Sequence, residues 1–227
     1  MKSAVITFPG SNCDRDMDVA LKKFGFKNKM VWHQDVELPK SDLVVLPGGF
    51  SYGDYLRCGS MASKSKIMQS VINFANSGGM VMGICNGFQI LVETGLVPGV
   101  LLRNKYLEFI CKNVFVKINN KNNSYFKNIN NDVLELHIAH NEGNYFCTND
   151  QLKEIEDNTQ VAINYCDPEG KIGEPFNPNG SIKNIAGIFN KEKNVLGMMP
   201  HPERMIDHSL SGEDGSHFFK NLINNLK

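Results

Sequence analysis

The first half of the chain alternates short apolar runs with segments of helical pattern, and this alternation limits the possible folds more than any other feature. Apolar runs bounded by Gly, Pro and Asn predict strands at residues 4–8, 30–32, 43–46 and 80–84. Helical spacing predicts helices between them, at residues 14–24, 60–76 and 86–93. The alternation therefore predicts an α/β fold with a mostly parallel central sheet and helices on both faces.

The second half is richer in strands. We expect them at residues 114–118, 134–139, 161–165, 185–189 and 195–199, with a closing helix at residues 215–226. Residues 119–131 are dense in Asn and Lys and are expected to form an exposed connection, and residues 177–180 are typical of a turn. No linker divides the 227 residues, so residues 1–227 are expected to form one domain with extra strands in its C-terminal half.

The composition excludes several classes of partner. Lys and Arg number 24 and Asp and Glu also 24, which argues against nucleic acid as a partner. The longest apolar stretch, residues 80–92, is interrupted by Asn86 and Gln89 and falls short of the roughly 18 residues of a membrane span. No P-loop pattern is present, so ATP binding through that motif is not expected.

The six cysteines are interpreted as reduced thiols. They are spread along the chain without zinc-ribbon spacing, so no metal site is expected. The sequence shows no secretory leader, and we expect a cytoplasmic protein.

One cysteine differs from the others in its flanks. Cys85 lies between Gly83 and Gly87, where the predicted strand 80–84 meets the predicted helix 86–93. Small residues two positions before and after are needed where a chain reverses sharply around an exposed nucleophile. At the start of a helix the dipole is expected to lower the pKa of the thiol. Cys85 is therefore the candidate nucleophile, the alternative being a buried structural cysteine.

A thiol nucleophile needs a histidine as base and a carboxylate that orients the histidine, and two pairs of residues in the sequence meet this requirement. His201 and Glu203 flank Pro202, whose fixed φ favours a rigid arrangement, and His140 and Glu142 follow another predicted strand. Spacing favours the later pair only slightly.

A glycine loop supplies candidate oxyanion donors. Gly48 and Gly49 follow the predicted strand 43–46, and their backbone amides, with that of Asn86, are positioned to form an oxyanion hole.

These motifs resemble those of the class I glutamine amidotransferases, and further stretches resemble the glutaminase subunits of phosphoribosylformylglycinamidine synthase. The resemblance is carried by residues 8–14, 47–57, 83–89, 139–145, 177–181 and 200–204, within a likeness along nearly the whole chain. It implies a flavodoxin-like fold of the amidotransferase type. It also implies hydrolysis of glutamine to glutamate and ammonia for purine biosynthesis.

The resemblance also implies roles for particular residues. Cys85 would attack the glutamine carboxamide, His201 would carry the proton and Glu203 would orient His201. Gly49 and Asn86 would supply the oxyanion amides. The residues expected around the substrate are Gly48, Gln89, His140, Glu142 and Gly143.

The resemblance further implies partners. A separate synthetase subunit, with a small accessory subunit, would receive the ammonia, and ATP and Mg would be bound there, leaving this chain without a cofactor of its own. Two other interpretations stay open from the residues: a cysteine hydrolase of the same architecture acting alone, and a thiol sensor without catalysis.

Overall fold

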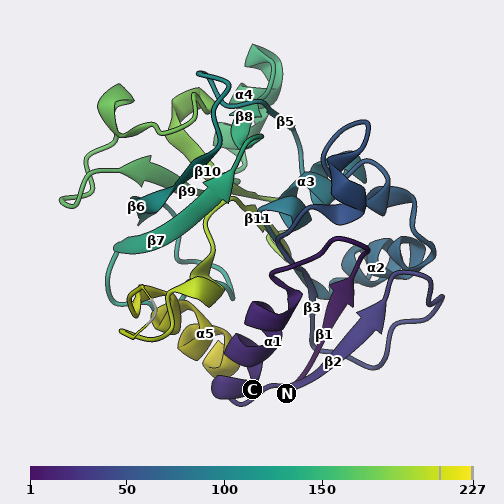
Figure 1. Cartoon of the computed structure of the whole chain (residues 1–227). Coiled ribbons are helices and arrows are strands. Elements are labelled where there is room, and N and C mark those ends of the chain that lie inside the picture. The colour runs from purple at the N-terminus through teal and green to yellow at the C-terminus, as the bar shows by residue number, and fades with distance from the viewer. Residues whose placement is uncertain (210, 226–227) are drawn as a thin grey trace.

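A continuous nine-stranded sheet runs through the computed structural model, which describes residues 1–209 and 211–225 (Figure 1). The order of its strands is β2-β1-β3-β4-β11-β10-β9-β6-β7. The first five in this order pair in parallel. They are β2 (Lys27–Trp32), β1 (Lys2–Thr7), β3 (Leu43–Leu46), β4 (Met80–Ile84) and β11 (Val195–Met198).

The other four strands pair antiparallel and extend the sheet beyond β11. They are β10 (Ile185–Phe189), β9 (Val161–Cys166), β6 (Ile110–Ile118) and β7 (Val133–His140). Beside them lies a small sheet of β5 (Val100–Leu102) and β8 (Asn144–Phe146). The expected fold class is confirmed, because the parallel strands follow the flavodoxin-like order and the additional strands come from the C-terminal half.

Burial along the strands follows their place in the sheet. Every residue of β3 and β4 is buried, as expected of parallel strands that helices cover on both faces. In β7 buried residues alternate with less buried ones, because only one face of this antiparallel edge strand packs on the core.

Five α-helices pack around the sheet in the described part of the chain. They are α1 (Asp14–Lys23), α2 (Lys66–Asn76), α3 (Asn86–Glu93), α4 (Asn149–Asp157) and α5 (Asp214–Asn225). Phe24, at the end of α1, stacks on Phe219 of α5 with ring centroids 5.6 Å apart, so these two helices lie together. In Figure 1, α2 and α3 lie on the side of the parallel strands away from α1. Among the described helices, none has the length and hydrophobicity needed to cross a bilayer.

The helix expected at residues 60–76 is shorter than predicted. Ser65 has extended backbone angles (φ −64°, ψ 150°), so α2 begins at Lys66 and a separate turn, η2 (Ala62–Lys64), precedes it. The helix expected at residues 215–226 is α5, which begins at Asp214; residue 226 lies outside the described residues. Helix α4 was not predicted, although Thr148 and Gln151 form a capping box at its start.

The prediction that residues 119–131 form an exposed connection is wrong for its apolar members. Tyr125, Phe126 and Ile129 are buried. The hydroxyl of Tyr125 lies 2.7 Å from the carbonyl oxygen of Val81 and 2.8 Å from that of Asn194. The Asn and Lys residues dominate the composition of the segment, but its aromatic side chains fix it to the core.

Candidate active site

The backbone turns sharply at Cys85, between the end of β4 and the start of α3. Cys85 has φ 50° and ψ −105°, a conformation that residues other than glycine rarely adopt. A Cβ on Gly83 would lie 2.6 Å from the carbonyl oxygen of Gly87, and one on Gly87 would overlap the carbonyl of Leu46. The turn therefore requires both glycines, for the steric reason that the sequence suggested.

His201 and Glu203 follow β11 and form a buried pair. The Nδ1 atom of His201 lies 2.6 Å from the Oε1 atom of Glu203, and the two side chains are almost fully shielded from solvent. Because Nδ1 donates to the carboxylate, Nε2 is left as the nitrogen that can accept a proton. Among the described residues, Nε2 has no hydrogen-bond partner.

The sheet brings the nucleophile and this pair together. Strands β4 and β11 are parallel neighbours in which Ile84 pairs with Met198, so Cys85 and His201 follow them at the same edge of the sheet. Both side chains line one cavity of about 250 Å³. This volume is several times the roughly 30 Å³ that a water molecule takes up in the liquid, so a carboxamide side chain fits.

Cys85 and His201 are not hydrogen-bonded to each other in this structure. The Sγ atom of Cys85 lies 3.6 Å from the carbonyl oxygen of Ala139, a weak thiol hydrogen bond. Catalytic hydrogen bonds commonly tighten only when the substrate is bound, so a shared cavity is the arrangement that a substrate can complete.

Burial has the largest effect on the pKa of the Cys85 thiol. It raises the pKa of Cys85 above its ordinary value, and the neighbouring Cys13 and Glu203 act in the same direction. The backbone N–H of Asn86, at the start of α3, and the guanidinium of Arg204 act against them but are outweighed. The lowered pKa expected at a helix start is therefore wrong for this structure, because the effect of burial outweighs that of the helix start.

The glycine loop after β3 lies against the same cavity. Gly49 lines the cavity and has φ 140°, and a Cβ there would come within 2.8 Å of the backbone of Ser11 and Asn12. Hydrogen bonds from Cys13 N to Gly48 O (3.4 Å) and from Phe50 N to Gly10 O (3.1 Å) hold the loop on both sides of Gly49. A Cβ on Gly48 would press on the ring of His201, so this glycine contacts the base.

Comparison with known proteins gives the family of this fold and site. Residues 1–214 match the family described as the CobB/CobQ-like glutamine amidotransferase domain. The chain belongs to this family.

Similar proteins agree with this assignment along the full length of the chain. The chain is 81% identical over 227 residues to the phosphoribosylformylglycinamidine synthase subunit PurQ of Pelagibacter ubique, with all of both chains covered. It is 49% identical over 230 residues to the protein of that name from Rhodopseudomonas palustris, covering 100% of this chain and 99% of the other. A chain in the solved structure of PurLQS from Thermotoga maritima is 39% identical, with a TM-score of 0.88 and coverage of 100% of this chain and 99% of that one.

Four other residues expected to hold the substrate, Gln89, His140, Glu142 and Gly143, belong to a hydrogen-bonded group. The side chain of Asn86 donates to Gln89 Oε1 (2.9 Å), and Gln89 Nε2 donates to the carbonyl of Glu142 (2.7 Å). Gln89 thus connects the helix that follows the nucleophile to the segment after β7. Among the described residues that line the Cys85 cavity, seven of the residues predicted for the site are absent: Gly48, Asn86, Gln89, His140, Glu142, Gly143 and Glu203.

Asn104 holds this segment and was not predicted. Its Oδ1 atom accepts from the Nδ1 atom of His140 (3.1 Å) and from the backbone N–H of Gly143 (3.1 Å), and its Nδ2 atom donates to the carbonyl of His140 (2.9 Å). Burial lowers the pKa of His140 to about 4, and the nearby His201 adds to the effect. His140 is therefore bound to an amide, and Glu142 is not its partner. No motif surrounds Asn104, so nothing in the sequence pointed to it.

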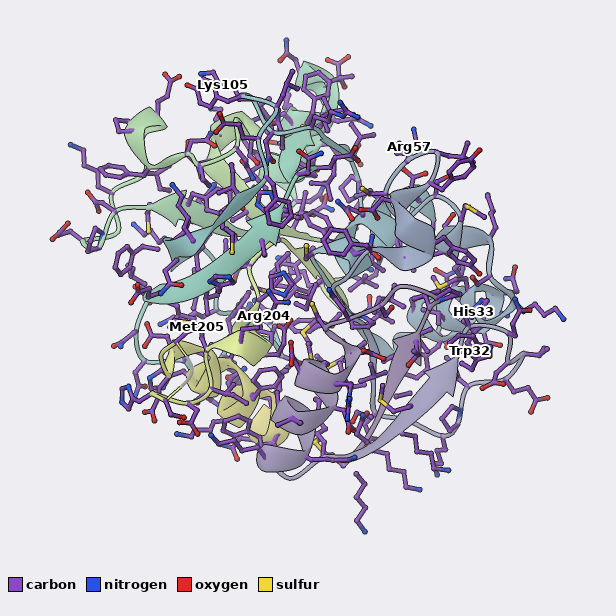
Figure 2. The ribbon with its side chains drawn as sticks, viewed as in Figure 1. Trp32, His33, Arg57, Lys105, Arg204 and Met205 are labelled. Carbon is purple, nitrogen blue, oxygen red and sulfur yellow. The ribbon has the colours of Figure 1, made fainter. Side chains whose placement is uncertain are left out.

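Cys13 and Arg204 also line the cavity of Cys85 and His201, and neither was given a role in advance. Arg204 donates from Nη2 to the Sγ atom of Cys13 (2.9 Å), and its Nε atom lies 3.6 Å from Asp16. Figure 2 shows Arg204 between the turn after β11 and α1. Burial and Glu203 raise the pKa of Cys13 to about 12. Both residues belong to stretches that carry the family resemblance, but their separation in sequence hid their contact.

Proposed function

We propose that this chain is the glutaminase subunit of phosphoribosylformylglycinamidine synthase, acting through Cys85, His201 and Glu203. It hydrolyses glutamine to glutamate and ammonia. The observation that carries the proposal is the cavity in which Cys85 meets a histidine already bound at Nδ1 to a buried carboxylate. The family assignment and the PurQ relatives support the same activity.

The first half of the reaction forms a thioester. The Cys85 thiol gives its proton to Nε2 of His201 as the sulfur attacks the carboxamide carbon of glutamine. Glu203 stabilises the imidazolium that results, since its carboxylate already accepts from Nδ1. The backbone amides of Gly49 and Asn86 hold the oxyanion of the tetrahedral intermediate. As this collapses, His201 returns the proton to the departing nitrogen and ammonia leaves.

The second half releases glutamate. A water molecule gives a proton to His201 and attacks the thioester carbonyl, and the same two amides stabilise the second oxyanion. When the carbon–sulfur bond breaks, His201 returns the proton to the sulfur of Cys85, and the site is restored.

The remaining residues serve the substrate and its surroundings. Gly48 positions the imidazole ring of His201, as its close packing against that ring supports. Gln89, His140, Glu142 and Gly143 help to hold glutamine, as a hydrogen-bonded group that Asn104 keeps in place outside the lining of the Cys85 cavity.

Ammonia released by this chain is used by partners. A synthetase subunit, together with a small accessory subunit, converts formylglycinamide ribonucleotide to formylglycinamidine ribonucleotide with ATP and Mg, so this chain needs no cofactor. The structure of PurLQS from Thermotoga maritima, which contains a chain similar to this one, supports such an assembly. We place the reaction in the cytoplasm, where reduced thiols such as Cys85 persist.

Replacing the nucleophile tests the proposal. In the complex reconstituted with the synthetase and the accessory subunit, Cys85→Ala should abolish synthesis that depends on glutamine and leave synthesis from added ammonium intact. The matched control is Cys111→Ala, because Cys111 lines the same cavity but is exposed and distant in sequence from the turn. The control should keep both activities. If Cys85→Ala removes both activities, Cys85 serves folding or docking and the proposed mechanism is wrong.

A further inference from the structure

Cys13 lies beside His201 and Glu203 and forms a cluster of three potential metal ligands with them. The Sγ atom of Cys13, a ring nitrogen of His201 and a carboxylate oxygen of Glu203 all lie within 4.8 Å of one another. All three side chains are buried. The thiol comes from near the start of the chain and meets an imidazole and a carboxylate that lie two residues apart near its end. A thiol, an imidazole and a carboxylate are a ligand set that suits zinc and similar divalent ions.

Unused binding capacity in this group is a second, independent observation. The Oε2 atom of Glu203 and the Nε2 atom of His201 are buried and, within the described residues, lack hydrogen-bond partners. A buried carboxylate oxygen that lacks a hydrogen-bond donor lowers the stability of the fold. Of these two atoms, the proposed catalysis uses only Nε2 of His201. Oε2 of Glu203 is therefore free to bind a cation without breaking any contact of its own.

Gly48 lies against both the sulfur of Cys13 and the imidazole of His201. A Cβ on Gly48 would lie 3.2 Å from Cys13 Sγ and 3.3 Å from His201 Nδ1. The same Cβ would come within 2.6 Å of His201 Cε1, so the sulfur and the imidazole both pack against the backbone of Gly48 and lie close to each other. An ion bound between them would contact the nitrogen that orients His201.

The charges around the group also fit a divalent cation. A Cys13 thiolate and the Glu203 carboxylate balance a 2+ ion. The positive Arg204, which donates to the Cys13 sulfur and stabilises its thiolate form, lies near Asp16, whose carboxylate offsets it.

We propose that Cys13, His201 and Glu203 bind Zn²⁺ or a similar soft divalent ion, and that the bound ion switches off the triad. Cys13 loses its thiol proton to solvent, and the proton on Nδ1 of His201 moves to Nε2 as Nδ1 binds the metal. An imidazole protonated at Nε2 and bound at Nδ1 accepts no proton from Cys85. The ion inhibits because it displaces the Nδ1 proton to Nε2, the nitrogen that must accept the proton of Cys85, and the inhibition, though not the binding, rests on the proposed function.

Direct binding tests the site without any enzymatic readout. In the full chain carrying Cys85→Ala and Cys111→Ser, the other two thiols that line the cavity are gone, so Cd²⁺ bound at the site should give the ultraviolet charge-transfer absorption of a single cadmium–thiolate bond. Zn²⁺ should abolish this absorption by competition. Adding Cys13→Ser should remove the absorption, and adding Glu203→Gln should weaken Cd²⁺ binding by about tenfold or more.

Inhibition is then measured on the complex with its cysteines in place. Zn²⁺ should inhibit glutamine-dependent synthesis, and Cys13→Ser should shift the half-inhibitory concentration upward by about tenfold or more relative to its own activity without metal. Cys111→Ser is the control, and its inhibition curve should match that of the unaltered complex. Cys13→Ala is the second variant if Cys13→Ser does not fold.

Three results overturn the inference: an absorption that persists without Cys13, no absorption in the chain that keeps Cys13, or equal inhibition of the Cys13 variants and the unaltered complex. A complex that never uses glutamine would refute the proposed function instead, while the cadmium absorption would still report on the site.

Discussion

The imidazole ring of His140 is almost completely buried, and this burial should make the stability of the protein depend on pH. Its pKa falls from the ordinary 6.5 to about 4, because burial disfavours the charged ring. Between these two values the unfolded chain binds a proton that the folded chain does not. His140 therefore has no effect on the free energy of unfolding above pH 6.5, the pKa of the unfolded chain. As the pH falls below this value the free energy of unfolding decreases, by about 2 kcal/mol at about pH 5.

Replacing His140 with a residue that does not titrate should remove this loss. His140→Asn keeps a donor close to where Nδ1 meets Asn104. Chemical denaturation at neutral pH and at about pH 5 should show a smaller loss of unfolding free energy in this variant than in the unaltered chain. The control is His208→Asn, since His208 is exposed and should change nothing. Equal losses in all three proteins would contradict the buried, neutral His140.

Single residues also show what could be predicted from the sequence. Cys85 was found because glycines flank it, whereas spacing favoured His201 over His140 only slightly and the family resemblance decided between them. Cys13 and Asn104 were not found, because their partners come from the other end of the chain or from another strand. The pKa of Cys85 was predicted in the wrong direction, since the helix start is a local feature whereas burial depends on the whole fold.

At the scale of elements, Tyr125 makes hydrogen bonds that join the segment 119–131, between β6 and β7, to the core. The hydroxyl of Tyr125 reaches two carbonyl oxygens of the core, those of Val81 and Asn194. Tyr125→Phe should lower the free energy of unfolding by about 1–2 kcal/mol, because buried carbonyls lose a donor. Tyr106→Phe is the matched control, since Tyr106 is exposed and the same change there should have little effect. If the two variants unfold alike, the Tyr125 hydroxyl contributes nothing to stability.

Elements were predicted well where their pattern is strong. The bounds of β3, β4 and β10 were predicted correctly, because a short, continuous apolar run between turn residues is typical of a buried strand. The segment with Tyr125 was predicted wrongly because its polar composition outweighed three apolar side chains. The start of α2 was misplaced because nothing in the pattern distinguishes the extended Ser65 from a helical residue.

At the scale of the whole molecule, β11 joins the two parts of the sheet. It pairs with the parallel β4 on one side and the antiparallel β10 on the other. The chain should therefore unfold as one unit, as the domain prediction requires. Trp32, the single tryptophan, reports on one edge of the sheet, and a label on the exposed Cys111 reports on the strand next to the other edge.

Fluorescence of Trp32 and of the label should change over the same range of denaturant. A single calorimetric peak should accompany them. Two separate transitions would mean that the parallel and antiparallel parts fold independently and that the chain has two domains.

The position of β11 has a consequence for the order of events during synthesis. The strand in the middle of the sheet is the last one to leave the ribosome, and His201 follows directly after it. A growing chain therefore exposes its reactive sulfur long before the histidine exists. By the proposed mechanism, unfinished chains cannot hydrolyse glutamine, because hydrolysis requires His201 and so begins only after β11 has been inserted into the sheet.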